Sequence, residues 1–182
     1  MDQKKLEQAA RLIIEAVGED PEREGLVETP RRFAEMMAEQ LAYAGVPNEE
    51  IARAFDKTFS SPESDMVVVK DISLFSHCEH HIALMYNMKA AVGYIPRGRV
   101  IGLSKIARIA DAVSKRLQIQ ERIGADIRDV MERITGAGDV IVLLAGQHSC
   151  MTARGIRKPG TLTRTISASG RFRTCLLYTS PS

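Results

Sequence analysis

"MVVVKDISLFSHCEHHIALMYNMKAAVGYIP", residues 66–96, carries two predicted strands and a cluster of metal-coordinating side chains between them. Residues 66–75 are first β-branched and then alternate apolar and polar side chains, and residues 83–96 form a second long run that ends in proline. Such runs predict two strands. The turn between them carries a cysteine, a glutamate and two adjacent histidines, in a chain that has only three cysteines and four histidines. The same stretch therefore predicts half of a sheet and half of a metal site.

The sequence that follows predicts a pair of helices between further strands. After a turn at residues 97–99 and a short strand at 100–103, apolar side chains recur at helical spacing until a "GAG" break at 136–138. The expected elements are helices over 104–117 and 118–134 and strands over 139–151 and 160–172. This order indicates an α+β fold in which the helices cover one face of the sheet.

The first third of the chain is predicted to be helical. Apolar residues recur at helical spacing over residues 6–17. A second helix is expected with Thr29 as its N-cap and Pro30 as its first helical residue, and a shorter helix follows. We therefore expect an N-terminal helical region over residues 1–60 and a second domain over residues 61–173.

Composition narrows the class of protein. The 182 residues carry 25 Lys and Arg against 23 Asp and Glu, so the net charge of +2 is too small to indicate nucleic acid as a partner. Apolar residues make up 45%, as in soluble globular proteins, and no apolar run of about 18 residues could cross a membrane. The N-terminus lacks the apolar core of a signal peptide, so we expect a cytoplasmic protein without a membrane or nucleic-acid partner.

Two short motifs supply the soft ligands that zinc prefers. Cys78 and His81 have C-x-x-H spacing, which lets a tight turn aim both side chains at one ion. His148 and Cys150 lie on a segment expected to be extended, where side chains two residues apart share a face. Cys78, His81 and Cys150 would give Zn²⁺ three ligands and leave the fourth position to water, as in catalytic sites. His80 and His148 then remain as candidate proton carriers.

Each half of this site has a simpler explanation when it is taken alone. A cysteine such as Cys150 is often a small core hydrophobe. A closed structural site would need a fourth ligand, for which Cys175 and His77 are the other soft candidates, and neither has helpful spacing. The occurrence of both motifs in one chain favours a metal site.

Cationic side chains near these motifs suit a phosphorylated substrate. Lys105 and Arg108 lie on one face of a helix that begins beside Ser104, and a helix N-terminus with two cations can bind phosphate. Arg154 adds positive charge shortly after Cys150. The alternative is a solvated basic face without a ligand.

Gln120 and Glu121 stand near the start of the helix expected over residues 118–134. A carboxylate beside an amide can match the hydrogen-bonding edge of guanine. A surface glutamate near a helix N-terminus is also favoured by the helix dipole alone, and the residues by themselves favour this second explanation.

Five motifs in one order resemble the GTP cyclohydrolase I family over most of the chain. They are "CEHH" (78–81), "YIP" (94–96), "GLSKIAR" (102–108), "QIQER" (118–122) and "HSCMTARG" (148–155). The resemblance implies a zinc-dependent hydrolase that converts GTP to 7,8-dihydroneopterin triphosphate and formate in pterin and tetrahydrofolate biosynthesis. It also implies the tunnelling fold for the catalytic domain over residues 61–173, namely a four-stranded antiparallel sheet with two antiparallel helices on one face. The implied assembly is a homo-oligomer of pentameric rings, two of which stack as a decamer, with active sites between subunits.

The resemblance also implies a role for each candidate residue. The metal ligands are Cys78, His81 and Cys150, in agreement with the spacing argument. The proton-transfer residues are His80 and His148. Glu121 anchors guanine, with Gln120 beside it. The ribose and triphosphate end is lined by Ser104, which is counted among the catalytic residues, and by Lys105, Arg108 and Arg154.

Two other functions agree with part of the pattern. A tunnelling-fold relative such as the nitrile reductase of queuosine synthesis uses NADPH and one nucleophilic cysteine without zinc, which would leave the H-x-C-M motif unexplained. A non-catalytic zinc-binding assembly module would keep the same ligands and present its basic residues to a partner.

"TCLLYTSPS", residues 174–182, changes character abruptly. Where the resemblance implies a charged segment and a short helix, this stretch is polar and turn-prone and reads like the translation of a sequencing adapter. We therefore expect residues 174–182 to be a non-native, poorly packed tail in which Cys175 is not a ligand. A divergent native tail is the alternative.

Overall fold

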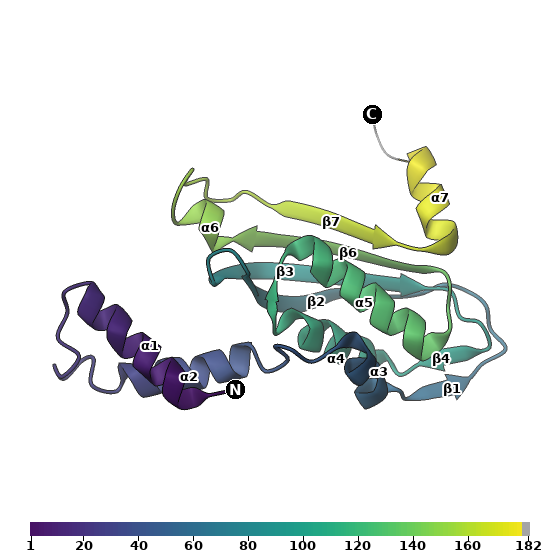
Figure 1. Cartoon of the computed structure of the whole chain (residues 1–182). Helices are drawn as coiled ribbons and strands as arrows, with labels where there is room; N and C mark the ends of the chain where they lie inside the picture. The colour runs from purple at the N-terminus through teal and green to yellow at the C-terminus, as the bar shows by residue number, and fades with distance from the viewer. Residues whose placement is uncertain (180–182) are drawn as a thin grey trace. The chain divides into compact units, whose positions relative to one another are not determined.

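The computed structural model describes the backbone of residues 1–179 and the side chains of residues 1–174 (Figure 1). The chain divides into two compact units, one over Met1–Ala44 and the other from Gly45 onward. Within the described residues, no helix is both long and apolar enough to span a membrane.

The first unit contains two packed helices, α1 (Gln3–Ala16) and α2 (Thr29–Gln40). The side chains that they bury are small or flexible apolar ones: Ala10, Ile14, Ala34 and Met37. The expectation that Thr29 caps α2 was wrong by one residue. Thr29 is the first helical residue, and Glu28 holds the N-cap position without a side-chain hydrogen bond.

The second unit is built on a five-stranded sheet. Four antiparallel strands form its body, and a two-residue strand adds in parallel at one edge. In spatial order the strands are β5 (Leu117–Gln118), β2 (Val67–Cys78), β3 (Ala83–Tyr94), β6 (Val140–His148) and β7 (Thr163–Ala168). The expected α+β class is confirmed. The sequence could not reveal β5, because two residues are too few to form a pattern.

Two helices, α4 (Leu103–Ser114) and α5 (Gln120–Thr135), cover one face of this sheet, as the sequence pattern predicts (Figure 1). Helix α4 contacts β2, and α5 contacts β6 and β7. Gly124 lies where α5 approaches β7 closely, since a Cβ there would stand 3.3 Å from the Cβ of Ser167. A glycine that lowers helix propensity thus permits close packing.

The second unit begins at Gly45, ahead of the boundary expected after residue 60. It includes α3 (Asn48–Phe55) and a small antiparallel pair formed by β1 (Thr58–Ser60) and β4 (Arg99–Ile101). The reason is tertiary packing against α5. Ile51 is fully buried, and Asn48 Nδ2 donates to carboxylate oxygens of Asp126 at 3.2 Å and Asp129 at 3.0 Å.

The strand expected over residues 139–151 is shorter than its apolar pattern suggests. β6 ends at His148, and the next four residues form one helical turn, α6 (Ser149–Thr152). Backbone hydrogen bonds hold this turn, including Ala153 N–H to Ser149 O at 2.9 Å.

The C-terminal region also differs from the expected strand over residues 160–172. β7 ends at Ala168, and α7 (Gly170–Thr179) follows, so the backbone is helical where the sequence predicted a turn-prone tail. Asp139 accepts a hydrogen bond from the Arg171 backbone N–H at 2.8 Å and fixes the start of α7. The prediction that Cys175 is not a ligand lies outside the described side chains.

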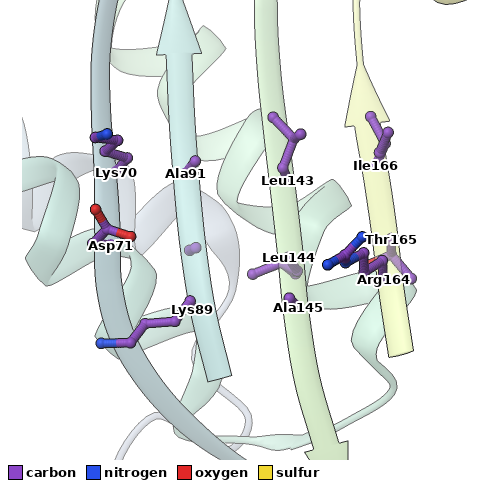
Figure 2. A pocket seen from close by; sticks show the side chains of 11 residues that line it. Lys70, Asp71, Lys89, Ala91, Leu143, Leu144, Ala145, Arg164, Thr165 and Ile166 are labelled. Carbon is purple, nitrogen blue, oxygen red and sulfur yellow. The ribbon is translucent and has the colours of Figure 1, made fainter. Parts of the chain in front are cut away.

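The face of the sheet opposite the helices holds a pocket of about 420 Å³ formed by the middles of β2, β3, β6 and β7 (Figure 2). Lys70, Lys89 and Arg164 stand around a floor that includes Leu143 and Ile166. This pocket shares no residue with the candidate metal centre.

Candidate metal centre

The turn between β2 and β3 brings the first two candidate ligands together. Cys78 is the last residue of β2, and Ile82 N–H donates to the Cys78 carbonyl at 2.9 Å to close the turn. Ile82 has a φ of 50°, in the left-handed region. As the C-x-x-H spacing predicts, Cys78 Sγ and His81 Nδ1 face one another at 3.8 Å.

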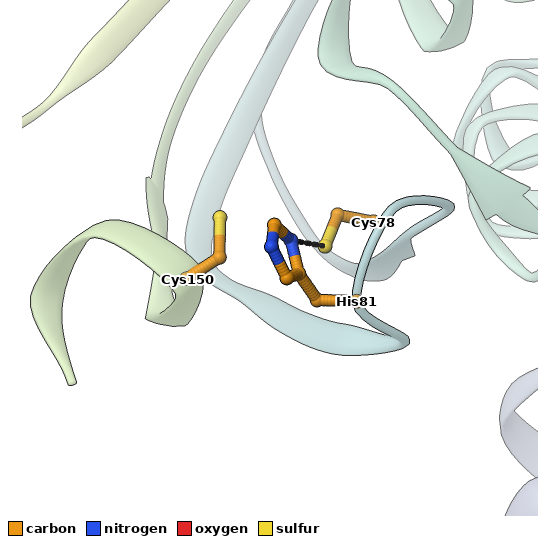
Figure 3. Close-up of side chains that lie close together, drawn as sticks. All are labelled: Cys78, His81 and Cys150. Carbon is orange, nitrogen blue, oxygen red and sulfur yellow. Dashed lines mark hydrogen bonds between the residues drawn. The ribbon is translucent and has the colours of Figure 1, made fainter. Parts of the chain in front are cut away.

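The third ligand arrives by a different route from the one expected. Cys150 lies in α6 and not on a strand, so the argument that it shares a strand face with His148 was wrong. The helical turn re-aims the thiol toward β2, and the Tyr86 hydroxyl lies 3.2 Å from the Thr152 hydroxyl, which ties α6 to β3. The ligand atoms of Cys78, His81 and Cys150 all lie within 4.8 Å of one another (Figure 3).

This donor group fits a zinc ion in chemistry and spacing. Tetrahedral Zn–S bonds of about 2.3 Å and Zn–N bonds of about 2.0 Å separate ligand atoms by roughly 3.6–3.8 Å. Burial raises the pKa of the Cys150 thiol, and the neighbouring Cys78 adds to the effect. A divalent cation binds cysteine sulfur as thiolate, so metal binding would offset this effect at Cys150.

His77 does not join this group. It is buried, burial lowers its pKa, and its Nδ1 has no hydrogen-bond partner among the described residues. The ligand group within the described part of the chain therefore has three members, which is the count typical of catalytic zinc sites.

His80 and Arg154 flank His81. The exposed His80 ring lies edge-on to the His81 ring with 6.3 Å between centroids, so it is accessible to a substrate. Arg154 Nη1 lies 2.8 Å from His81 Nε2, where the guanidinium can only donate. Arg154 thus stands at the ligand group itself.

His148 occupies the end of β6 directly before α6. Its Nε2 lies 2.9 Å from Gln120 Oε1 at the start of α5. Burial lowers the pKa of His148, and the negative charge of Glu121 acts in the opposite direction. The structure therefore brings a partly buried imidazole and a carboxylate to the same end of the sheet as the ligand group.

Arg122 is a residue of this region that the sequence reasoning missed. It forms a paired salt bridge with Glu79, with Nη–Oε distances of 2.7 Å and 3.2 Å. The bond from Arg122 lowers the pKa of Glu79 and ties the ligand-bearing turn to α5. The sequence shows a glutamate in "CEHH" and an arginine in "QER", which have opposite charges. It does not show that they pair, because residues 43 positions apart share no periodic pattern.

Ser104, Lys105 and Arg108 are not brought to the ligand group in this chain. Ser104 and Lys105 lie in the first turn of α4, where the Lys105 ammonium stands 5.7 Å from the Phe55 ring centroid, and Arg108 lies in the middle of the helix. The end of α4 adjoins the metal centre, because the Ser76 hydroxyl donates to the Ser114 carbonyl at 2.7 Å and Cys78 pairs with β5. At 1.5 Å per residue, the two ends of α4 are roughly 15 Å apart.

Comparison with known proteins identifies the family. A sequence model of GTP cyclohydrolase I matches residues 6–176. GTP cyclohydrolase 1 of Clostridium acetobutylicum is 54% identical over 178 residues, which cover 95% of this chain and 91% of that relative. GTP cyclohydrolase 1 of Clostridium beijerinckii is 53% identical over 180 residues, which cover 96% and 91%.

A solved structure titled as the archaeosine synthase QueF-Like in the apo form aligns with a TM-score of 0.45 and 19% identity, covering 60% of this chain and 96% of that one. The family match, by contrast, takes in every segment that carries a candidate ligand or proton carrier. This chain belongs to the GTP cyclohydrolase I family.

Proposed function

We propose that this chain hydrolyses GTP to 7,8-dihydroneopterin triphosphate and formate, the first step of pterin and tetrahydrofolate biosynthesis. The observation that carries the proposal is the convergence of Cys78, His81 and Cys150 from separate elements. His80 and His148 are neighbours of these residues in the sequence, in a chain that matches the family over residues 6–176.

Zinc is the cofactor proposed for Cys78, His81 and Cys150. Two sulfur donors and one nitrogen donor favour Zn²⁺ over Mg²⁺ and Ca²⁺, which take oxygen ligands. When bound, the ion supplies a Lewis acid and lowers the pKa of its coordinated water. Because two thiolates would offset the charge of the ion, the reaction also needs proton carriers from the chain.

His80 and His148 are proposed to move those protons. Release of C8 as formate breaks its bonds to both N9 and N7, two water molecules supply the oxygen atoms of formate, and each nitrogen gains protons as its bond to C8 breaks. His80 is exposed and lies in the β2–β3 turn. His148 is half-buried and is the last residue of β6. General acid–base groups placed in this way contribute about 10²–10⁴-fold to such steps.

Glu121 and Arg154 are proposed to hold the two ends of GTP. The Glu121 carboxylate is exposed at the start of α5 and can accept from two guanine N–H groups. Arg154 lies 2.8 Å from His81 and can reach an anionic oxygen near the ligand group.

The remaining anion-binding residues are proposed to come from a neighbouring subunit. Ser104 and Lys105 lie in the first turn of α4, at the end of the helix away from the metal centre of their own chain, and Arg108 lies in its middle. This placement supports a triphosphate site that a second chain completes. We propose the tunnelling-fold assembly of pentameric rings, stacked as a decamer, in which the start of one α4 meets the metal centre of the next subunit.

Metal analysis combined with a GTP assay tests the proposed function. Purified protein loaded with zinc should release formate from GTP and form a product that fluoresces as neopterin after oxidation and dephosphorylation. Chelated protein is the matched control and should be inactive until zinc is restored.

The outcomes separate the competing functions. Bound zinc without GTP turnover would support a zinc-binding assembly module instead. Absence of zinc together with oxidation of NADPH would support a nitrile reductase and would contradict the proposal.

A further inference from the structure

Gln120 is an enclosed polar side chain whose amide has partners on two strands, β6 and β7. The residue is 1% exposed. Its Nε2 lies 3.0 Å from the Thr163 carbonyl oxygen and 3.3 Å from the Thr165 hydroxyl on β7, and its Oε1 lies 2.9 Å from His148 Nε2. Gln120 therefore joins the start of α5 to β7 and to the last residue of β6.

The partners of Gln120 determine which way its amide points. The Thr163 carbonyl can only accept a hydrogen bond, so the amide nitrogen must face it. The Leu144 carbonyl, 3.5 Å from the same nitrogen, requires the same orientation. The amide oxygen therefore faces His148.

The orientation of the Gln120 amide in turn determines the tautomer of His148. An amide oxygen can only accept, so His148 Nε2 must carry a proton. In a neutral imidazole the lone pair then lies on Nδ1. A hydrogen bond to one ring nitrogen thus assigns the role of the other.

The surrounding backbone is shaped for this contact. A Cβ added to Gly146, two residues before His148, would stand 3.2 Å from Gln120 Oε1 and 2.8 Å from Met88 Cγ. A side chain at residue 146 would therefore displace Met88 and the Gln120 amide oxygen. The contact between Gln120 and His148 thus depends on a glycine at this position.

We propose that Gln120 is a positioning residue that orients the His148 ring with Nε2–H toward its amide oxygen and leaves Nδ1 as the nitrogen that exchanges protons with the substrate. The inference rests on the proposed GTP hydrolysis and replaces the expectation that the Gln120 side chain contacts guanine. Its amide is already occupied by Thr163, Thr165 and His148, whereas the Glu121 side chain is exposed.

Steady-state kinetics of zinc-loaded Gln120→Leu and Gln120→Glu test this role. Leucine removes every hydrogen bond of the amide, and we expect kcat to fall about 10²-fold with KM for GTP little changed, as for a misplaced catalytic group. Glutamate still accepts from His148, so Gln120→Glu should recover part of that loss. Gln147→Leu is the matched control, an equivalent change next to His148, and should behave like the wild type.

A double-mutant cycle with His148→Ala provides the decisive comparison. If Gln120 acts through His148, adding Gln120→Leu to His148→Ala should cost no further activity. Additive losses would overturn the proposal. It would also be overturned if Gln120→Leu raised KM for GTP and removed discrimination against inosine triphosphate, because that result marks a guanine contact.

Chemical labelling separates failure of this inference from failure of the proposed function. Diethyl pyrocarbonate reacts with unprotonated imidazole nitrogen, and peptide mass spectrometry reports each histidine separately. Gln120→Leu should change the labelling rate of His148 several-fold and leave that of His80 unchanged. An unchanged His148 rate would overturn the inference even in an active enzyme, whereas wild-type protein that never turns over GTP would overturn the function alone.

Discussion

At the residue scale, membership of the ligand group separates two adjacent histidines with the same exposure. His80 and His81 are both exposed, but only His81 faces Cys78 Sγ, at 3.8 Å. The ligand group of Cys78, His81 and Cys150 does not include His80. This difference predicts distinct consequences for substitutions that look equivalent in the sequence.

Removal of a single ligand should abolish metal binding and activity together. We expect Cys78→Ser, His81→Ala and Cys150→Ser each to lose zinc, because a site with three protein ligands cannot spare one. His80→Ala should keep zinc and lose about 10²–10⁴-fold in turnover. Atomic absorption and the GTP assay on the same samples provide the test, and retention of zinc by His81→Ala with its loss from His80→Ala would reverse the assignment.

Glu121→Gln should impair use of GTP without releasing zinc. A neutral amide cannot accept from two guanine N–H groups at once, and loss of one hydrogen bond to a charged group costs about 10- to 10²-fold in kcat/KM. The measurement is kcat/KM for GTP with zinc content as the control. Equal turnover of ATP and GTP by the wild type would contradict this role.

At the element scale, the junction of β6 and α7 depends on one enclosed carboxylate. Asp139 is 2% exposed, accepts the Arg171 backbone N–H, and lies 3.2 Å from Arg171 Nε and 3.5 Å from Arg97 Nη2. The backbone hydrogen bond from Arg171 is the largest cause that lowers the pKa of Asp139, and burial acts against it.

Asp139→Asn should remove an acid-sensitive part of the stability. Because the folded pKa is lowered, the charged carboxylate stabilises the fold above the unfolded pKa of about 3.9 and loses this effect as pH falls through the folded value. The difference in Tm between wild type and variant should be largest near neutral pH and shrink below about pH 4. Thermal unfolding of metal-free samples measures it, and a difference independent of pH would contradict the prediction.

At the scale of the whole molecule, the separation of the two ends of α4 decides where a complete site can form. The candidate metal centre adjoins the end of α4, and Lys105 stands near its start. If the site lies between subunits, a mutation in the metal centre and a mutation at Lys105 should each inactivate the enzyme. Mixing the two variants should then restore activity at some interfaces.

Coexpression of His81→Ala with Lys105→Ala should restore activity that neither variant shows alone. In rings mixed at random, about a quarter of the interfaces would pair an intact metal centre with an intact Lys105 from the neighbour. Purification through tags on both chains, followed by the GTP assay, measures this fraction. Absence of restoration in mixed oligomers would place both residues in a site within one chain.

Deletion of residues 175–182 should leave zinc content and GTP turnover unchanged. The family match ends at residue 176, and none of the proposed metal ligands or substrate-binding residues lies after Thr174. The comparison requires full-length and shortened protein at equal zinc load. Loss of either property would show that this segment is part of the working fold.

The family and the α+β class were predictable from the sequence alone, and so were the three residues that come together as the candidate ligand group. "CEHH" could be interpreted because the geometry of a C-x-x-H turn depends on four adjacent residues, and Cys78 and His81 meet as predicted. The helices and long strands were predictable for a similar reason, since their periodicity is a local property.

Only the tertiary structure decided how the second half of the site is built. Cys150 reaches the other ligands from a helical turn, because packing of α6 against β3 overrides the strand pattern of residues 139–151. Gln120 is enclosed under His148, and α3 joins the second unit, through contacts between residues far apart in the chain. Such contacts depend on how the elements pack, and neither periodicity nor motif spacing records them.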